Sequence, residues 1–238
     1  MNRMTQTSQP TALITGASKG LGRALAHALA ARGWRLVVDA RSSSALSAAA
    51  AGLPNAVPIR GDVADAGHRA ALAAAVERIG RLDLLVNNAS ELGPSPLPAL
   101  AGYPLDALRA VYETDVVAPL ALTQLLLPML RTAHGAVLNV SSDAAVEAYP
   151  GWGGYGSAKA ALDHVSAVLA VEEPDVRIYA VDPGDMRTDM HQAAFPGEDI
   201  SDRPEPATVV PALLRLVDAR PASGRYRAAE WAAAEAAR

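Results

Sequence analysis

Strand-like apolar runs alternate with helical patterns along the whole chain. This alternation is typical of a parallel sheet with helices on both faces, because each parallel connection must cross back over the sheet. We therefore predict one α/β domain with a doubly wound, mostly parallel seven-stranded sheet. Strands are expected at Thr11–Thr15, Arg35–Ala40, Ala56–Arg60, Asp83–Val86, Ala136–Val140, Arg177–Val181 and Gly224–Arg227, and helices at Gly20–Ala31, Ser43–Ala51, Ala66–Ile79, Leu105–Arg131, Gly156–Glu172 and Ala207–Asp218.

The length of 238 residues fits a single domain with a well-buried core. Residues 1–10 are expected to form a flexible tail before a domain spanning residues 11–238. Two long loops rich in proline and glycine, Leu92–Pro104 and Phe195–Pro206, follow strand ends. Ligands bind outside the carboxyl ends of such strands, so these loops, and residues 185–206 in particular, are candidate walls of a substrate pocket. They could also be ordinary surface connections.

Composition excludes several function classes. There is no cysteine for disulfides or thiolate chemistry, the five histidines have no paired metal-ligand spacing, and the net charge of −4 offers no basic surface for nucleic acid. The most apolar stretch, Val116–Leu130, is short for a membrane span, and the N-terminus lacks a signal-peptide core. We expect a cytoplasmic protein that acts on a small molecule, without a metal, a nucleic acid or a membrane as partner.

A glycine-rich segment joins the first strand to the first helix. It reads Thr15-Gly16-Ala17-Ser18-Lys19-Gly20-Leu21-Gly22. A backbone that turns tightly and approaches a pyrophosphate has no room for bulky side chains, and the helix that follows offers unpaired N–H groups to the anion. A glycine loop alone is weak evidence, but this position between a first strand and a first helix strengthens the prediction of a dinucleotide site.

The end of the second strand bears on which dinucleotide binds. An acidic residue there favours NAD through the ribose hydroxyl, whereas an arginine accepts the 2′-phosphate of NADP. The chain has both Asp39 and Arg41, and Lys19 in the glycine loop could add a second cation. Two cations favour NADP(H), while the role of Asp39 stays open.

A tyrosine and a lysine lie four residues apart, at Tyr155 and Lys159, where a helix is predicted to begin. Residues at this spacing share a helix face, and an ammonium near a phenol favours the phenolate, which suits proton transfer. Of 21 basic residues only Lys19 and Lys159 are lysines, so the amine itself is indicated as the required group. Ser142, after a strand, could hydrogen-bond a substrate oxygen, or merely end that strand.

Together these motifs resemble the short-chain dehydrogenase/reductase family along nearly the whole chain. The resemblance implies that Ser142 polarises the substrate oxygen, that Tyr155 transfers the proton, and that Lys159 lowers the tyrosine pKa and binds the nicotinamide ribose. It also implies cofactor contacts from the glycine loop (Gly16, Ser18, Lys19, Gly20, Leu21 and Gly22), from Arg41, from Asp62 and Val63 at the adenine, from Asn88 and Ala89, and from Pro183, Gly184 and Thr188 near the nicotinamide.

The chain departs from the family pattern at two positions. Asp115 stands where the family usually has a catalytic asparagine that holds a water linked to the lysine, and Ser90 stands where glycine commonly follows Asn-Asn-Ala. A carboxylate at 115 opposes the positive field on Tyr155, so we expect Asp115→Asn to preserve or raise turnover. We expect Ser90 to affect the shape of its loop more than the chemistry.

The resulting hypothesis is a carbonyl reductase that reduces a ketone or aldehyde with NADPH, reversibly with alcohol oxidation. Rival readings are a non-catalytic NADP(H)-binding sensor and a structural module. The segment Pro183–Gln192 resembles the sepiapterin and benzil reductase branch, and the resemblance implies a homodimer or homotetramer. Candidate substrate contacts are Glu91, Leu92, Tyr149, Trp152, Met186, Met190 and His191.

Overall fold

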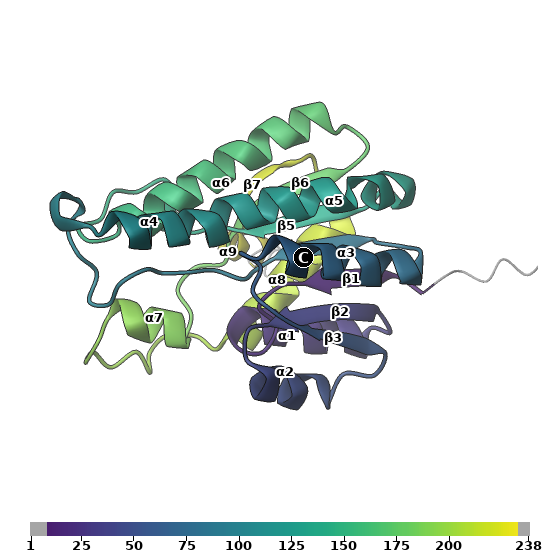
Figure 1. The fold of residues 1–238 in the computed structure, drawn as a ribbon, viewed down its shortest axis with the longest axis horizontal. Coiled ribbons are helices and arrows are strands. Elements are labelled where there is room, and N and C mark those ends of the chain that lie inside the picture. Colours follow the sequence, from purple (N-terminus) through teal and green to yellow (C-terminus); the bar gives the residue numbers. More distant parts are fainter. Residues whose placement is uncertain (1–8, 233–238) are drawn as a thin grey trace, which may run out of the picture.

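The computed structural model describes residues 9–232, so most of the expected tail, residues 1–8, lies outside the described residues. The described chain forms one seven-stranded parallel sheet in the order β3-β2-β1-β4-β5-β6-β7 (Figure 1). The expected fold class is confirmed. The strands are β1 Thr11–Ile14, β2 Arg35–Ala40, β3 Ala56–Arg60, β4 Leu84–Asn87, β5 Ala136–Val140, β6 Arg177–Asp182 and β7 Gly224–Arg227.

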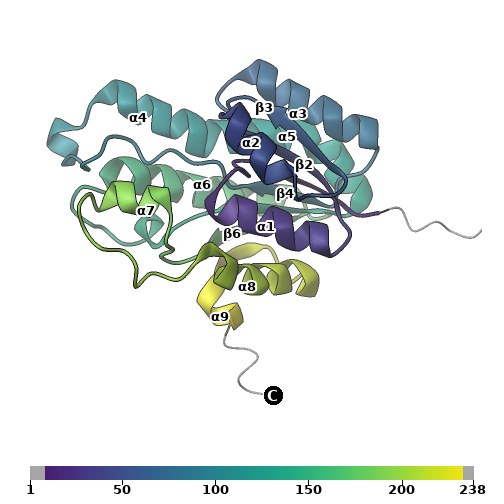
Figure 2. The ribbon, with the colours of Figure 1, turned by 90° about the horizontal axis from the view of Figure 1, so that it is seen from below.

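Alternate side chains of each central strand face opposite layers of helices, as the period of two in a strand requires. Ala12 and Ile14 of β1 pack with the helices on one face, and Leu13 packs with those on the other. The first layer contains α1 Gly20–Ala31, α2 Ser43–Ala50, α8 Pro206–Ala219 and α9 Ala228–Ala232; the second contains α3 Ala66–Ile79, α5 Ala118–Ala133 and α6 Gly153–Glu172 (Figures 1 and 2).

The segment expected as one helix from Leu105 is a continuous helical rod made of three pieces. They are α4 Leu105–Tyr112, the π-helical turn η2 Glu113–Val117, and α5. By length and composition alone, Leu105–Ala133 is long and apolar enough to cross a membrane. It is longer than Val116–Leu130, the apolar stretch considered from sequence. In this fold Leu122, Leu126 and Leu130 are buried against the sheet, as in a core helix.

Besides the π-helical turn, four short elements were not predicted. Two are 3-10 turns, η1 Leu100–Gly102 and η3 Asp143–Ala145. The others are short helices: α7 Asp189–Ala194, within the loop region after β6, and α9 Ala228–Ala232, after β7. Both views show α7 and its flanking loops beyond the end of the sheet, on the side where α4 begins (Figures 1 and 2). Helix α6 starts at Gly153, three residues earlier than expected, so Tyr155 lies in its first turn.

Candidate active site

A cleft of about 1090 Å³ lies along the carboxyl ends of the strands. The sheet order reverses direction between β1 and β4, which is where ligands bind in doubly wound folds. Nearly all the predicted site residues come together in this cleft. Its described lining includes Gly16, Ser18, Lys19, Gly20, Leu21, Arg41, Asp62, Val63, Asn88, Ala89, Ser142, Tyr155, Lys159, Pro183, Gly184 and Thr188.

Two predicted site residues, Gly22 and Asp115, are not among the described residues that line the cleft. Gly22 lies beneath the glycine loop, where an added Cβ would come within 2.4 Å of the Asn88 side chain and 2.6 Å of the Gly16 carbonyl oxygen. The loop can fold onto α1 only because this residue lacks a side chain. Asp115 is fully buried in η2, behind the cleft.

The two candidate loops behave differently. Phe195 and Pro206, the end residues of the second candidate loop, line the cleft. No residue of Leu92–Pro104 is among the described lining residues, so that part of the expectation is not met. Leu92 instead packs in an apolar cluster with Tyr155 and Ala194, which places the loop beside the cleft and not at its wall.

Asp39 is a structural anchor for the glycine loop. Its carboxylate is buried, with one oxygen accepting a hydrogen bond from the Gly16 N–H at 2.7 Å and the other 2.8 Å from Nε2 of His68. Burial raises the pKa of Asp39, and the His68 contact opposes that shift. Both oxygens already have partners, so this residue is poorly placed to select a ribose hydroxyl.

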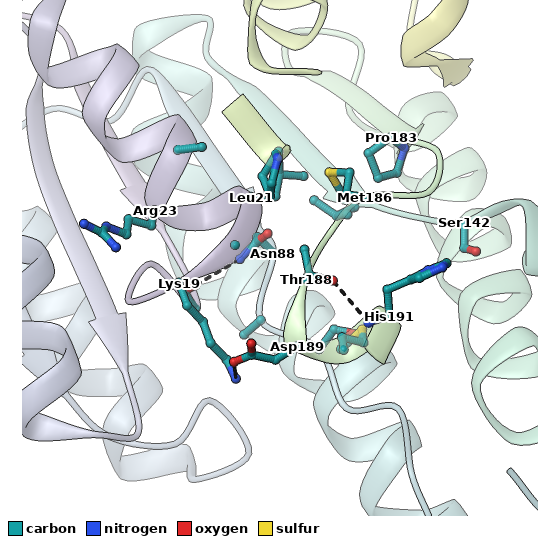
Figure 3. Close-up of a pocket in the computed structure, with 18 of the residues that line it drawn as sticks. Lys19, Leu21, Arg23, Asn88, Ser142, Pro183, Met186, Thr188, Asp189 and His191 are labelled. Atoms are coloured by element: carbon teal, nitrogen blue, oxygen red, sulfur yellow. Dashed lines mark hydrogen bonds and ion pairs between the residues drawn. The ribbon is translucent and has the colours of Figure 1, made fainter. Parts of the chain in front are cut away.

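The two candidate phosphate-binding cations both face the cleft. Lys19 Nζ lies 2.8 Å from Asp189 at the start of α7, and Arg41 lies 3.3 Å from Glu91 after β4 (Figure 3 shows the lysine pair). All four side chains are largely or partly exposed, which makes each ion pair weak and exchangeable. A bound phosphate could therefore replace either carboxylate.

Helix α1 begins without a capping side chain. Lys19 occupies the N-cap position, its side chain makes no cap hydrogen bond, and the first turn contains no acidic residue. The first N–H groups of a helix have no partner within the helix and attract anions. With two cations nearby and a roomy cleft, these residues fit the phosphates of a dinucleotide.

The proton-transfer candidates meet at the other end of the cleft. Lys159 is buried, donates a hydrogen bond to the carbonyl oxygen of Val140 at 3.0 Å, and lies over the Tyr155 ring, 5.3 Å from its centroid. Gly156 holds this turn against η3, because an added Cβ would come within 2.6 Å of the Ala144 carbonyl oxygen. The Ser142 segment and Tyr155 are thereby kept together.

Carboxylates surround Tyr155. Burial raises the pKa of its phenol, and the negative charges of Asp115, Asp143 and Asp182 add to that rise. The sequence argument expected Lys159 to lower this pKa, whereas in this structure burial and the three carboxylates raise it.

Two functional neighbours were missed from sequence. Asp143 accepts a hydrogen bond from the Ser142 hydroxyl at 2.9 Å, and it lines the cleft. Arg225 of β7 donates to the carbonyl oxygen of Ser142 at 2.9 Å and pairs with Asp163 of α6 at 2.8 Å. Adjacency to Ser142 could have indicated Asp143, whereas nothing in the sequence ties residue 225 to residue 142.

Comparison with known proteins agrees with this geometry. The chain is 36% identical to sepiapterin reductase of Xenopus tropicalis over 198 residues, which cover 76% of each protein. Its fold matches a short-chain dehydrogenase from Streptomyces avermitilis (TM-score 0.82, 30% identity, 97% of this chain and 93% of that one). It also matches an alcohol dehydrogenase from Thermococcus sibiricus complexed with 5-hydroxy-NADP (TM-score 0.83, 27% identity, 92% and 95%).

A sequence model described as short chain dehydrogenase matches residues 10–199, most of the chain. That span contains the glycine loop, Ser142, Tyr155 and Lys159. The chain therefore belongs to the short-chain dehydrogenase/reductase family of oxidoreductases.

Proposed function

We propose that the protein reduces a ketone or aldehyde with NADPH, reversibly with oxidation of the alcohol. The observation that carries this proposal is geometric: the buried phenol of Tyr155, with Lys159 over its ring, lies in the same cleft as Ser142 and as a glycine loop with two nearby cations. A phenol next to an ammonium can give its proton to a substrate oxygen, which is what reduction needs.

NADPH, when bound, supplies the hydride. The glycine loop and the first turn of α1 would hold its pyrophosphate, and Lys19 and Arg41 would neutralise its 2′-phosphate. A related structure solved with 5-hydroxy-NADP supports this choice.

Three side chains act on the substrate. Ser142 turns its hydroxyl from Asp143 to the carbonyl oxygen and polarises it, and Tyr155 donates its proton to the same oxygen. Lys159 opposes the neighbouring carboxylates and stabilises the phenolate that remains. The intact set of these three residues favours catalysis over a non-catalytic sensor.

The substrate end of the cleft is partly aromatic. Tyr149, Trp152 and Phe195 line it with Met186 and Met190. Ring contacts between Trp152 and both Tyr155 and Phe195, at centroid distances of 5.8 and 5.9 Å, make a stacking surface near the phenol. A small-to-medium carbonyl compound with ring or alkyl character fits this lining.

A homodimer or homotetramer remains part of the proposal. Leu105, Val117 and Leu125 are exposed apolar residues on the α4–η2–α5 rod. Burying them against a second copy would remove apolar surface from water.

The experiment is to follow NADPH absorbance with a panel of aldehydes, diketones and cyclic ketones. Wild-type protein should oxidise NADPH with at least one carbonyl, and Tyr155→Phe should be nearly inactive on the same compound. Cofactor binding without turnover across the panel would favour the sensor. Failure to bind either dinucleotide would favour a structural module.

A further inference from the structure

His68 is a buried titratable residue that the proposed mechanism does not use, and it is not among the described residues that line the cleft. Its Nε2 lies 2.8 Å from Asp39 Oδ2, and the two side chains are only 5% and 2% exposed. A carboxylate can only accept hydrogen bonds, so the Nε2–H of His68 donates to the ionised Asp39. Because the Gly16 N–H takes the other oxygen, His68 completes the partners of this carboxylate.

The position of the His68 ring is set by the ends of two strands. His68 lies in the first turn of α3, and Gly61 directly follows β3. An added Cβ at Gly61 would come within 2.0 Å of His68 Nδ1, so the ring fills the space that a side chain there would need. The Gly61 N–H in turn donates to the Ala40 carbonyl oxygen at the end of β2, at 3.1 Å. The ring is thereby held beside the ends of β2 and β3.

Asp39 itself borders the nucleotide end of the cleft. It is one of the lining residues, and Ala40 and Arg41 follow it at the end of β2. In doubly wound folds this strand end lies beside the adenosine ribose of the dinucleotide. The 2′-hydroxyl of NADH is a hydrogen-bond donor that suits a free carboxylate oxygen, whereas the 2′-phosphate of NADPH is an anion that such a carboxylate repels. The state of Asp39 Oδ2 therefore bears on which dinucleotide binds.

We propose that His68 sets the preference for NADPH over NADH, as a positioning residue that acts through Asp39; this inference rests on the NADPH preference of the proposed function. By donating to Asp39 Oδ2, His68 occupies the oxygen that would otherwise accept the ribose hydroxyl of NADH. Lys19 and Arg41 then attract the 2′-phosphate without a free carboxylate beside them. Specificity is a difference between two affinities, so denying NADH a partner counts as much as attracting NADPH.

A purely structural role for His68 gives a different expectation. Both dinucleotides have the same pyrophosphate, so a residue that only stabilises the glycine loop affects the binding of both alike. The two differ at the ribose 2′ position, where one has a hydroxyl and the other a phosphate. The ratio of the two dissociation constants therefore isolates the effect at Asp39 from the general condition of the loop.

The test measures this ratio by fluorescence titration with NADPH and NADH. His68→Leu and His68→Gln are made in the wild-type chain and in Asp39→Asn, with the exposed His164→Leu as the matched control. His68→Leu should lower the ratio of the NADH Kd to the NADPH Kd about tenfold, because a charged hydrogen-bond acceptor is released. His68→Gln, whose side-chain amide can donate in place of Nε2, should recover most of the ratio. Without the carboxylate, in Asp39→Asn, His68→Leu should change the ratio less than about twofold.

The outcomes separate this inference from a structural effect and from the proposed function. The Tm of each variant checks its folding, and His68→Asn, whose amide is shorter, replaces His68→Leu if that chain does not fold. An equal loss of affinity for both dinucleotides, or the same shift in ratio with and without the Asp39 carboxylate, overturns the role of His68. If wild-type protein prefers NADPH and His68→Leu keeps the ratio, this inference alone fails. If wild-type protein binds NADH as tightly as NADPH, the proposed cofactor preference fails with it.

Discussion

The two ends of the cleft are held by different forces. At the nucleotide end, the glycine loop is fixed by buried hydrogen bonds: Asp39 accepts from Gly16 N–H, and Asn88 Nδ2 donates to the Thr15 carbonyl oxygen at 2.8 Å. At the substrate end, α7 is held by the exposed Lys19–Asp189 pair and by ring contact between Phe195, which follows α7, and Trp152 at the start of α6, at a centroid distance of 5.9 Å. The first end has little tolerance for change, whereas the second can vary with the substrate.

The largest effect on turnover should come from Tyr155→Phe, which removes the phenolic hydroxyl without disturbing the nucleotide end of the cleft. Turnover should fall by at least about a hundredfold, because the donor of the reduction is lost, while NADPH affinity stays within about twofold. Steady-state absorbance gives the first quantity and NADPH fluorescence titration the second. Tyr112→Phe, outside the cleft lining, is the matched control; comparable losses in the two variants would contradict the assignment.

Gly22→Ala should have the opposite effect to Tyr155→Phe: it should weaken NADPH binding more than it lowers kcat. Its new methyl group would collide with Asn88 and the Gly16 carbonyl, so the glycine loop must shift. We expect NADPH affinity to fall about tenfold and unfolding free energy to fall by about 1–3 kcal/mol, the usual cost of overpacking. At saturating NADPH, kcat should fall by much less than the affinity does. At Gly102 an added Cβ would meet no atom within 4 Å, so Gly102→Ala should change neither quantity.

Lys19 and Asp189 join the two ends, and their substitution should shift NADPH affinity in opposite directions. Lys19→Gln removes a cation from the 2′-phosphate and should weaken NADPH binding about fivefold, whereas Asp189→Asn frees Lys19 and should strengthen it about twofold. Both shifts should shrink at high salt, because the side chains are exposed. The same affinities measured with NADH should barely change; a similar change for both dinucleotides would place Lys19 away from the 2′-phosphate.

Much of the fold and the nucleotide end could be predicted from sequence because both depend on local rules. β2, β3, β5 and β7 and helices α1 and α3 have the predicted bounds, since apolar periodicity, glycine and proline fix them locally. The predicted cofactor contacts of the glycine loop, apart from Gly22, line the cleft.

The surroundings of Tyr155 could not be predicted because they depend on pairs far apart in the chain. Burial and the negative charges of Asp115, Asp143 and Asp182, on three different elements, raise the pKa of the phenol, whereas the sequence argument considered Lys159 alone. The partners of Asp39 are also distant: His68 lies 29 residues away and turns a suspected ribose ligand into an anchor. Ser90 was expected to shape a loop, and only the fold shows that it lines the same cleft as Tyr155.

The smallest effect concerns stability at the proton-transfer end. The pKa of buried Asp115 is raised, so its favourable contribution is complete below the unfolded pKa near 3.8 and is lost as pH rises through the folded pKa. Asp115→Asn keeps an oxygen for the Glu91 N–H and has no charge to bury. The difference in Tm, variant minus wild type, should therefore grow between pH 4 and pH 8, by a few degrees if the change is about 1 kcal/mol. Thermal melts across the range measure it, and a difference that shrinks with rising pH would mean that Asp115 is stabilised as a carboxylate.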